Sequence, residues 1–325
     1  MSTAFVTGGT GFLGRHIIDN LVADGWDVIA LHRSNSNIDH LRKIRVELVE
    51  GTITDLASIE SVIPDAIDAV FHVAGNTNMW SLRNNQQTQD NVDGTRNVVT
   101  VAIEKKAKRF VYTSTIAAFG FNPGFITEET SSNSSESWIN YFRSKWEAEQ
   151  EVKSGISRGL DAVMLNPSNI IGPYDYKNWS QMFLMVKQNK LPALPSGEAS
   201  FCHAQEVGKA HIAAYHKGRS GHNYLLGGVD ATYSKVFHEI GKMLNRPVPD
   251  RILPTWLMNV IGRFYLLVSY VTRKEPDLTP EKIALTRGRL VCSSEKAIRE
   301  LNYKPVSLEV MLRDCYDWMV SESLI

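Results

Sequence analysis

The hydrophobic positions in the first half of the chain alternate between short compact runs and longer amphipathic stretches. Six runs are apolar and rich in β-branched residues, as expected of strands that are covered on both faces. They are residues 4–7, 28–31, 46–49, 69–73, 110–113 and 162–165. Between them, the stretches 12–23, 86–105 and 138–154 are predicted helices, with apolar and small residues at helical spacing. This alternation predicts a parallel sheet with crossover helices.

The regular alternation ends after residue 165, and prolines punctuate shorter elements from there onward. Proline interrupts helices and central strands, so smaller elements are expected in this part. The predicted fold class is α/β, with a doubly wound parallel sheet and a smaller C-terminal α+β lobe. We expect one domain over residues 1–165, to which some later segments return, and a second lobe over residues 166–325. The cleft between them is the expected site.

A glycine-rich turn follows the first predicted strand and opens the first predicted helix, in the spacing Gly-x-x-Gly-x-x-Gly. Glycine lets the backbone approach a pyrophosphate closely, and the N–H groups and dipole of the helix start attract the anion. A tight connection without a ligand is the alternative. The strand–turn–helix context favours a Rossmann-type dinucleotide site in the first domain. Residues 166–325 are then expected to be mainly the substrate lobe. The predicted cofactor contacts here are Gly8, Thr10, Gly11, Phe12, Leu13 and Gly14.

The end of the second predicted strand bears on which dinucleotide binds. An acid there would hydrogen-bond the ribose 2′-OH of NAD, but the chain runs into Arg33, which can pair with a 2′-phosphate. NADP(H) is therefore favoured, with NAD(H) as the alternative cofactor and a solvated loop cation as the alternative role of Arg33. After the third strand, Asp55, followed by Leu56, could accept a hydrogen bond from an adenine amine or cap a helix.

Tyr141 and Lys145 stand four residues apart in the third predicted helix, which places them on one face. A phenol has a pKa of about 10, so it serves as an acid–base catalyst near neutral pH only when a nearby cation stabilises its phenolate. Lys145 can supply that cation. The pattern Tyr-x-x-x-Lys also arises by chance as a surface pair. Two other features support a catalytic role for this pattern. They are the glycine turn and the hydroxyl-rich end of the strand over residues 110–113.

Six ordered motifs resemble the extended short-chain dehydrogenase/reductase family, of the NAD-dependent epimerase/dehydratase type, over nearly the whole chain. They are TGGTGFLG at 7–14, FHVAG at 71–75, NVDGTRNV at 91–98, YTST at 112–115, YFRSK at 141–145 and NPSNIIGP at 166–173. The resemblance implies that Tyr141 gives a proton to a carbonyl oxygen as hydride arrives from the nicotinamide. It implies that Lys145 lowers the pKa of Tyr141 and holds the nicotinamide ribose. Thr115 would hydrogen-bond the same oxygen, with Ser114 as the alternative.

The resemblance also implies cofactor contacts outside the glycine turn. His72, Ala74 and Gly75 match the family's turn along the cofactor. Pro167 and Ser168 match the strand end beside the nicotinamide. Asn91 matches a helix asparagine with either a cofactor-binding or a structural role. The implied contacts are His72, Ala74, Gly75, Asn91, Ser114, Pro167 and Ser168, together with Tyr141 and Lys145. The family usually has arginine before the proline of the last motif, where this chain has Asn166.

The residues after Thr115 narrow the substrate class within the family. Sugar-nucleotide dehydratases place an Asp-Glu pair there, but this chain has Ile116 and Ala117, so water elimination is set aside. Epimerases commonly carry an arginine shortly before a Phe-x-His stretch, and residues 196–203 contain none. The segments 114–120 and 200–203 are more similar to the dihydroflavonol reductase and 3β-hydroxysteroid dehydrogenase branch.

The expected function is therefore NADP(H)-dependent reduction of a ketone or aldehyde of a largely apolar small molecule. Met and aromatic residues can line such a pocket, although most of them are expected to be ordinary core. They are Met79, Trp80, Trp179, Met182, Phe183, Met185, Trp256, Met258, Phe264 and Tyr265. A nucleotide-sugar epimerase is the first alternative. The second is a non-catalytic NADP-binding sensor, which is disfavoured because such chains typically lose the tyrosine or the lysine.

Composition narrows location and partners. Lys plus Arg and Asp plus Glu are 35 each, so the whole chain has no basic surplus for nucleic acid or anionic lipid. Three well-separated cysteines and the absence of a signal-peptide pattern indicate a cytoplasmic protein. The nine histidines show no metal-ligand motif, and no metal is expected.

The apolar stretch 254–270 favours a cap helix over a pocket, with weak peripheral membrane contact as the alternative. The family resemblance is compatible with a homodimer.

Overall fold

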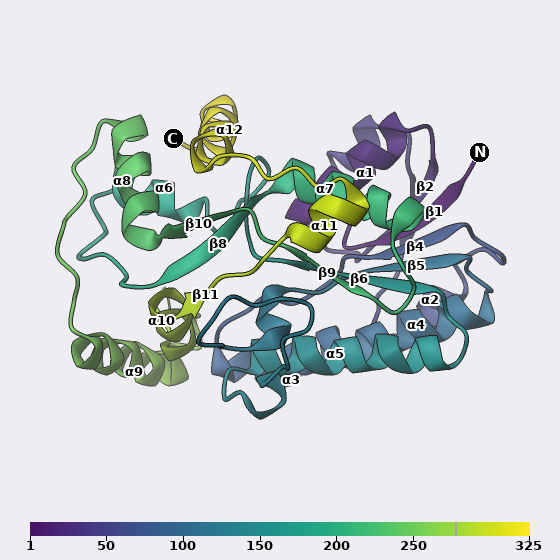
Figure 1. The fold of residues 1–325 in the computed structure, drawn as a ribbon, viewed down its shortest axis with the longest axis horizontal. Helices are drawn as coiled ribbons and strands as arrows, with labels where there is room; N and C mark the ends of the chain where they lie inside the picture. Colours follow the sequence, from purple (N-terminus) through teal and green to yellow (C-terminus); the bar gives the residue numbers. More distant parts are fainter. Residues whose placement is uncertain (277) are drawn as a thin grey trace.

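The computed structural model describes residues 1–276 and 278–325, and its main layer is a seven-stranded parallel sheet (Figure 1). The strand order is β3-β2-β1-β4-β5-β6-β9. The bounds are β1 Thr3–Thr7, β2 Asp27–His32, β3 Glu47–Glu50, β4 Ala69–His72, β5 Arg109–Thr113, β6 Ala162–Pro167 and β9 Asn223–Leu226. All six predicted strands are present, and the predicted doubly wound α/β fold is confirmed.

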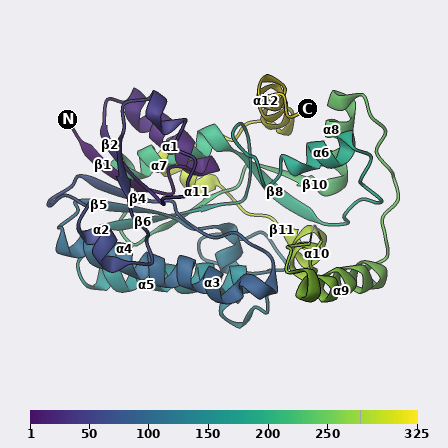
Figure 2. The same ribbon diagram turned by 180° about the vertical axis from the view of Figure 1, so that it is seen from behind.

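Helices cover both faces of this sheet, which explains why its inner strands are mainly apolar (Figures 1 and 2). One face packs against α1 (Phe12–Ala23), α7 (Ala204–Lys217) and α11 (Glu295–Leu301). The other packs against α2 (Leu56–Glu60), α4 (Gly94–Glu104) and α5 (Asn140–Ser157). Short 3₁₀ turns occupy Leu41–Lys43, Ser81–Arg83, Ile116–Phe119 and Ser134–Glu136.

Two predicted helices differ in detail from the structure. The stretch 86–105 is interrupted: α3 (Asn84–Thr88) leads through a π-helical turn (Gln89–Asp93) into α4. The helix predicted from residue 138 begins at Asn140 instead, and Trp138 is an exposed residue before it. Apolar periodicity assigned that tryptophan to the helix, but its side chain has no core to enter.

The second lobe is built on a small sheet around β8 (Glu198–His203). On one edge β10 (Val229–Thr232) pairs antiparallel, while β7 (Asn169–Ile171) and β11 (Arg289–Leu290) pair parallel with different stretches of the other edge. Its core is closed by α6 (Gln181–Lys187), α8 (Tyr233–Leu244) and α12 (Leu308–Ser321). The remaining helices, α9 (Thr255–Thr272) and α10 (Pro280–Arg287), lie together at a corner of this lobe (Figure 1).

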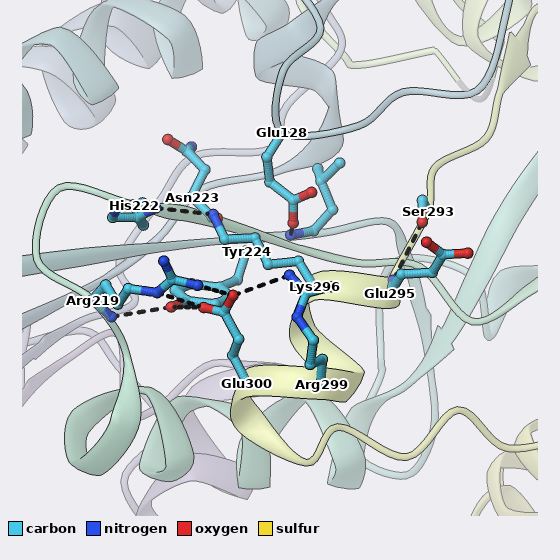
Figure 3. A network of polar contacts seen from close by, with 11 residues as sticks. Glu128, Arg219, His222, Asn223, Tyr224, Ser293, Glu295, Lys296, Arg299 and Glu300 are labelled. Carbon is cyan, nitrogen blue, oxygen red and sulfur yellow. Dashed lines mark hydrogen bonds and ion pairs between the residues drawn. The ribbon is translucent and has the colours of Figure 1, made fainter.

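A polar network attaches α11 to the last strand of the large sheet (Figure 3). The carboxylate of Glu300 pairs with Arg219 and accepts a hydrogen bond of 2.8 Å from the Tyr224 hydroxyl. The ammonium of Lys296 donates to the carbonyl of Asn223 at 2.8 Å. These contacts hold β9 at the edge of the sheet, where the Leu226 carbonyl accepts from the N–H of Ser168 at 3.0 Å.

All three cysteines are buried free thiols in the second half of the chain. Cys202 lies in β8, Cys292 follows β11, and Cys315 lies in α12. Burial raises the pKa of the Cys202 and Cys315 thiols to about 12, and it raises that of Cys292 as well. These thiols are packing residues.

Candidate active site

The glycine turn lies where β1 ends and α1 begins, and its glycines are required by close packing. Gly8 has a φ of +74°, and a Cβ there would lie 2.5 Å from the backbone nitrogen of Ala74. A Cβ at Gly14 would collide with the carbonyl oxygen of Gly8. The same carbonyl accepts a hydrogen bond of 3.0 Å from the N–H of Gly11. The turn is therefore pressed against both the start of α1 and the segment after β4.

The first turn of α1 has no side-chain cap, because its N-cap residue is Gly11. Thr10 and Gly11 are exposed, Phe12 is half-buried, and Leu13 is buried in the core beneath the turn. An uncapped helix start with an exposed, side-chain-free approach suits an anion. The predicted pyrophosphate site therefore has the geometry that this ligand requires.

Arg33 and Asp55 lie at the ends of β2 and β3, on the adenosine side expected for a Rossmann-type site. Arg33 is the first residue after β2 and its side chain is exposed. Asp55 caps α2, since its carboxylate accepts from the N–H of Ala57 at 3.1 Å. Leu56, next in the chain, is 39% exposed. The helix-cap alternative for Asp55 is thus what the structure shows.

His72 ends β4 and is fully buried in a chain of hydroxyl groups. The Thr95 hydroxyl donates to the carbonyl of Asn91 at 2.6 Å, so it accepts from Nε2–H of His72 at 3.0 Å. Nδ1 of His72 then accepts from the hydroxyl of Thr7 at 2.7 Å, which itself accepts from the N–H of Ala74 at 3.2 Å. Burial lowers the pKa of His72 to about 3. The ring is a neutral structural link between β1, β4 and the first turn of α4.

Asn91, in the π-helical turn, has a structural role of the same kind. Its side-chain oxygen accepts from the N–H of Asn76 at 2.7 Å. Its Nδ2 donates to the carbonyl of Asn76 and to the hydroxyl of Ser144, both at 3.0 Å. The segment after β4 is thereby joined to α5, next to the predicted catalytic residues.

Tyr141 lies in the first turn of α5 and meets Thr115, which follows β5. Burial raises the pKa of the Tyr141 phenol, and a hydrogen bond with the Thr115 side chain acts in the opposite direction. Thr115 is held by its own contact, since its Oγ accepts from the N–H of Ala117 at 3.2 Å. The structure thus brings together the two hydroxyl groups that were predicted to act on one carbonyl oxygen.

Lys145 lies one turn further along α5, and its ammonium has two protein acceptors. Nζ donates to the phenol oxygen of Tyr112 at 2.7 Å and to the carbonyl of Thr113 at 2.9 Å. Burial lowers the pKa of Lys145 to about 7, and the charge of Glu149 opposes this shift. The expected lowering of the Tyr141 pKa is not seen, because burial dominates there and the ammonium contacts Tyr112 instead. Sequence reasoning missed Tyr112.

Asn166, which stands where the family usually has arginine, connects three parts of the site. Its Nδ2 donates to the carbonyl of Thr115 at 3.0 Å and to the carboxylate of Glu149 at 2.6 Å. Its side-chain oxygen accepts from Nδ2 of Asn223 at 2.9 Å. A short amide fits between these buried groups and fixes the backbone of Thr115. Glu149 and Asn223 had no signal in the sequence because they act through tertiary contacts.

Two buried serine hydroxyls at the carboxyl ends of β5 and β6 have no hydrogen-bond partner among the described residues, those of Ser114 and Ser168. Pro167 lies beside Ser168, at the end of β6. Gly75 approaches the same edge, since a Cβ there would lie 3.9 Å from Nζ of Lys145. Unpaired buried hydroxyls require a polar partner. Their position along the edge that begins at the glycine turn fits a bound dinucleotide.

Comparison with known proteins places this geometry in a family. Residues 4–227 match the model of the NAD dependent epimerase/dehydratase family. The chain is 27% identical over 329 residues to a putative dihydroflavonol 4-reductase of Synechocystis sp., covering 99% of this chain and 95% of that protein. It is also 27% identical over 328 residues to sterol demethylase protein B of Methylococcus capsulatus, covering 99% and 100%.

Solved structures agree with the fold. The crystal structure of gox2253 superposes with a TM-score of 0.86 at 27% identity, covering 99% of both chains. A UDP-glucose 4-epimerase from Thermotoga maritima superposes with a TM-score of 0.80 at 19% identity, covering 99% of this chain and 100% of that chain. The chain is thus an enzyme of the NAD(P)-dependent oxidoreductase type, and the predicted resemblance is confirmed. From its motifs, its parallel sheet and this match, the chain belongs to the NAD dependent epimerase/dehydratase family, within the extended short-chain dehydrogenases/reductases.

Proposed function

We propose that this enzyme reduces a carbonyl group on a largely apolar small molecule to an alcohol, with NADP(H) as its cofactor. The observation that carries the proposal is the meeting of Tyr141 and Thr115, with Lys145 one turn away and no carboxylate directly after Thr115. The relative named as a putative dihydroflavonol 4-reductase supports this class of reaction.

The bound nicotinamide supplies the hydride, and the protein groups supply position and a proton. The hydroxyls of Tyr141 and Thr115 orient the substrate oxygen, and Tyr141 donates its proton to that oxygen. Lys145 keeps one N–H beyond its two protein acceptors, and this proton serves the nicotinamide ribose. Ser114 and Ser168 gain a partner in the same cofactor, and the start of α1 binds the pyrophosphate.

The surroundings of the hydroxyl pair favour an apolar substrate. Tyr141 packs against a cluster that contains Met79, Ile116, Phe119 and Phe142. The side chains after Thr115, where a dehydratase would place acids, are apolar and buried. No carboxylate directly follows Thr115 to assist the removal of a sugar hydroxyl, so direct carbonyl reduction is the chemistry that the site supports best.

The test is consumption of NADPH with a panel of ketones and aldehydes that includes flavonoid, steroid and quinoline carbonyl compounds. We expect stoichiometric oxidation of NADPH with at least one apolar carbonyl compound. A nucleotide-sugar epimerase would interconvert UDP-sugars while it recycled its cofactor. Epimerisation without net NADPH consumption would overturn the proposal, and so would cofactor binding without turnover of any compound.

Arg33 is expected to select NADP(H) over NAD(H). We expect Arg33→Ser to weaken NADPH binding by about tenfold to a hundredfold, because a charged hydrogen bond to the 2′-phosphate is lost. NADH binding should be unchanged. Dissociation constants from titration of the intrinsic fluorescence measure both. Arg158→Ser, an exposed arginine at the far end of α5, is the control. Equal losses for both cofactors would show that Arg33 does not contact a 2′-phosphate.

Tyr112 is expected to hold Lys145 in its charged form. In Tyr112→Phe the buried ammonium loses an acceptor, so we expect the pKa of Lys145 to fall below about 7 by up to about one unit. The decline of kcat/KM on the alkaline side should then begin at lower pH. Tyr233→Phe is the matched control, because its buried hydroxyl has no partner among the described residues. An unshifted pH profile in Tyr112→Phe would show that this contact does not govern Lys145.

A further inference from the structure

Helix α9 presents an apolar stripe to the outside of the molecule. Its members are spaced four, four, three and four residues apart, which places them on one helical face. They are Trp256, Val260, Phe264, Leu267 and Val271, with exposures of 67%, 56%, 62%, 66% and 85%. A soluble surface rarely leaves so many large apolar side chains together in water. Figures 1 and 2 show α9 at the edge of the molecule, so the stripe is open to a large partner.

The opposite face of α9 packs on the protein, and its most buried residues are the small Gly262 and Ser269, with Met258 half-buried beside them. Gly262 approaches Ile283 of α10 so closely that an added Cβ would lie 2.5 Å from Cδ1 of Ile283. Ser269 is buried and its hydroxyl accepts from the indole N–H of Trp80 at 3.0 Å. Because small residues face inward, the outward position of the large residues follows from the helical spacing.

The charged side chains within residues 251–274, which include α9, are all cationic. The sequence contains no Asp or Glu from residue 251 to residue 274, whereas it contains Arg251, Arg263, Arg273 and Lys274. The next carboxylate, Glu275, is already paired with Lys282 at 3.2 Å. The chain as a whole has no basic surplus, so this is a local concentration of positive charge around an apolar face.

We propose that α9 docks this enzyme on the surface of an anionic lipid bilayer. The apolar stripe enters the boundary between headgroups and acyl chains, and the flanking cations contact the phosphates. Trp256 and the nearby Tyr265 and Tyr270 are residue types that are enriched at this depth. The helix lies in the plane of the interface, and no helix in the described part of the chain is long and apolar enough to cross a bilayer.

A second copy of the chain fits this face less well than lipid does. A twofold contact through the stripe would bring Arg263 of both copies to one interface, and α9 has no acid to pair with either. Like charges within an interface destabilise it. Anionic headgroups supply the missing negative charge, so charge complementarity selects the bilayer.

The experiment is co-sedimentation of the full-length enzyme with vesicles of phosphatidylcholine alone or with 30% phosphatidylglycerol. We expect binding to the anionic vesicles, weakened by 0.5 M NaCl. The double variant Phe264→Glu/Leu267→Glu should lose at least about tenfold in partition coefficient, and Arg263→Gln about fivefold. Val310→Glu on α12 replaces a residue with 45% exposure and should bind like wild type.

The readouts separate the proposal from its alternatives. All variants should retain the far-UV spectrum and NADPH binding of wild type, because the replaced residues are exposed and lie outside the cofactor site. No binding of wild type to anionic vesicles would overturn the proposal. A wild-type dimer that becomes monomeric in Phe264→Glu/Leu267→Glu, without vesicle binding, would assign the stripe to a second copy. Unchanged binding of the double variant would also overturn it.

Discussion

Tyr141→Phe should lower kcat by about 100- to 10,000-fold, with little change in the affinity for cofactor. The variant keeps the buried ring but removes the only proton that Tyr141 can give to the substrate oxygen. It also removes the partner of Thr115, which then has to hold that oxygen alone. Because burial already raises the pKa of the phenol, Tyr141 is protonated throughout the neutral range, as a proton donor for reduction must be.

Single-turnover reduction with saturating NADPH measures this effect, and fluorescence titration of NADPH measures the affinity. Tyr233→Phe is again the matched control, since both changes delete one hydroxyl from an aromatic ring that packs in an apolar cluster. The mechanism fails if Tyr141→Phe retains more than about a tenth of the wild-type rate. A comparable loss in Tyr233→Phe would show that the assay reports stability and not chemistry.

The second large effect is expected at the glycine turn. Gly8→Ala should reduce the free energy of unfolding by more than about 3 kcal/mol and remove measurable NADPH binding. The new methyl group combines a strained positive φ with a clash against the backbone after β4, and backbone has little freedom to move. The same change disturbs the approach of the pyrophosphate to α1.

Gly25→Ala separates the two causes of this loss. Gly25 has a φ of +78°, close to that of Gly8, but a Cβ there would meet nothing within 4 Å. We expect Gly25→Ala to reduce the free energy of unfolding by about 1–2 kcal/mol, because only the strain of the positive φ acts there. NADPH binding should be intact. Urea unfolding of both variants gives the comparison. Similar losses at the two positions would mean that close packing around Gly8 contributes nothing.

The sequence predicted those parts of the fold that repeat along the chain. The strand runs and the glycine turn have local signatures, because a buried strand must be apolar and a tight turn must lack side chains. The Tyr141, Lys145 and Thr115 positions followed from ordered motifs. The contact of Lys145 with Tyr112 had no such signature, since periodicity tells which residues share a face and not which residue lies opposite. The same holds for Asn166 and Glu149.

The stretch 254–270 shows that hydrophobic content alone does not determine which side of a helix faces the protein. Its apolar residues favoured a cap helix over a pocket. In α9 the most buried positions are the small Gly262 and Ser269, four large residues are half-buried, and the stripe is exposed. Total hydrophobicity could not give this orientation. The spacing of the two small residues, seven positions apart on one face, contains the signal that would have predicted it.

The positions of the three buried cysteines have a practical consequence for measuring motion. None lies in the first 200 residues, but Cys202 packs in the core on one face of the large sheet, together with residues of β1, β2 and β6. Raised thiol pKa values keep Cys202 and Cys315 inert in the closed state. Labelling of Cys202 therefore reports on fluctuations that open this core, whereas labelling of Cys315 reports on the core of the C-terminal lobe. Comparing the labelling rates of Cys202 and Cys315 with hydrogen exchange in β1 to β6 would tell whether the two halves of the enzyme open together or separately.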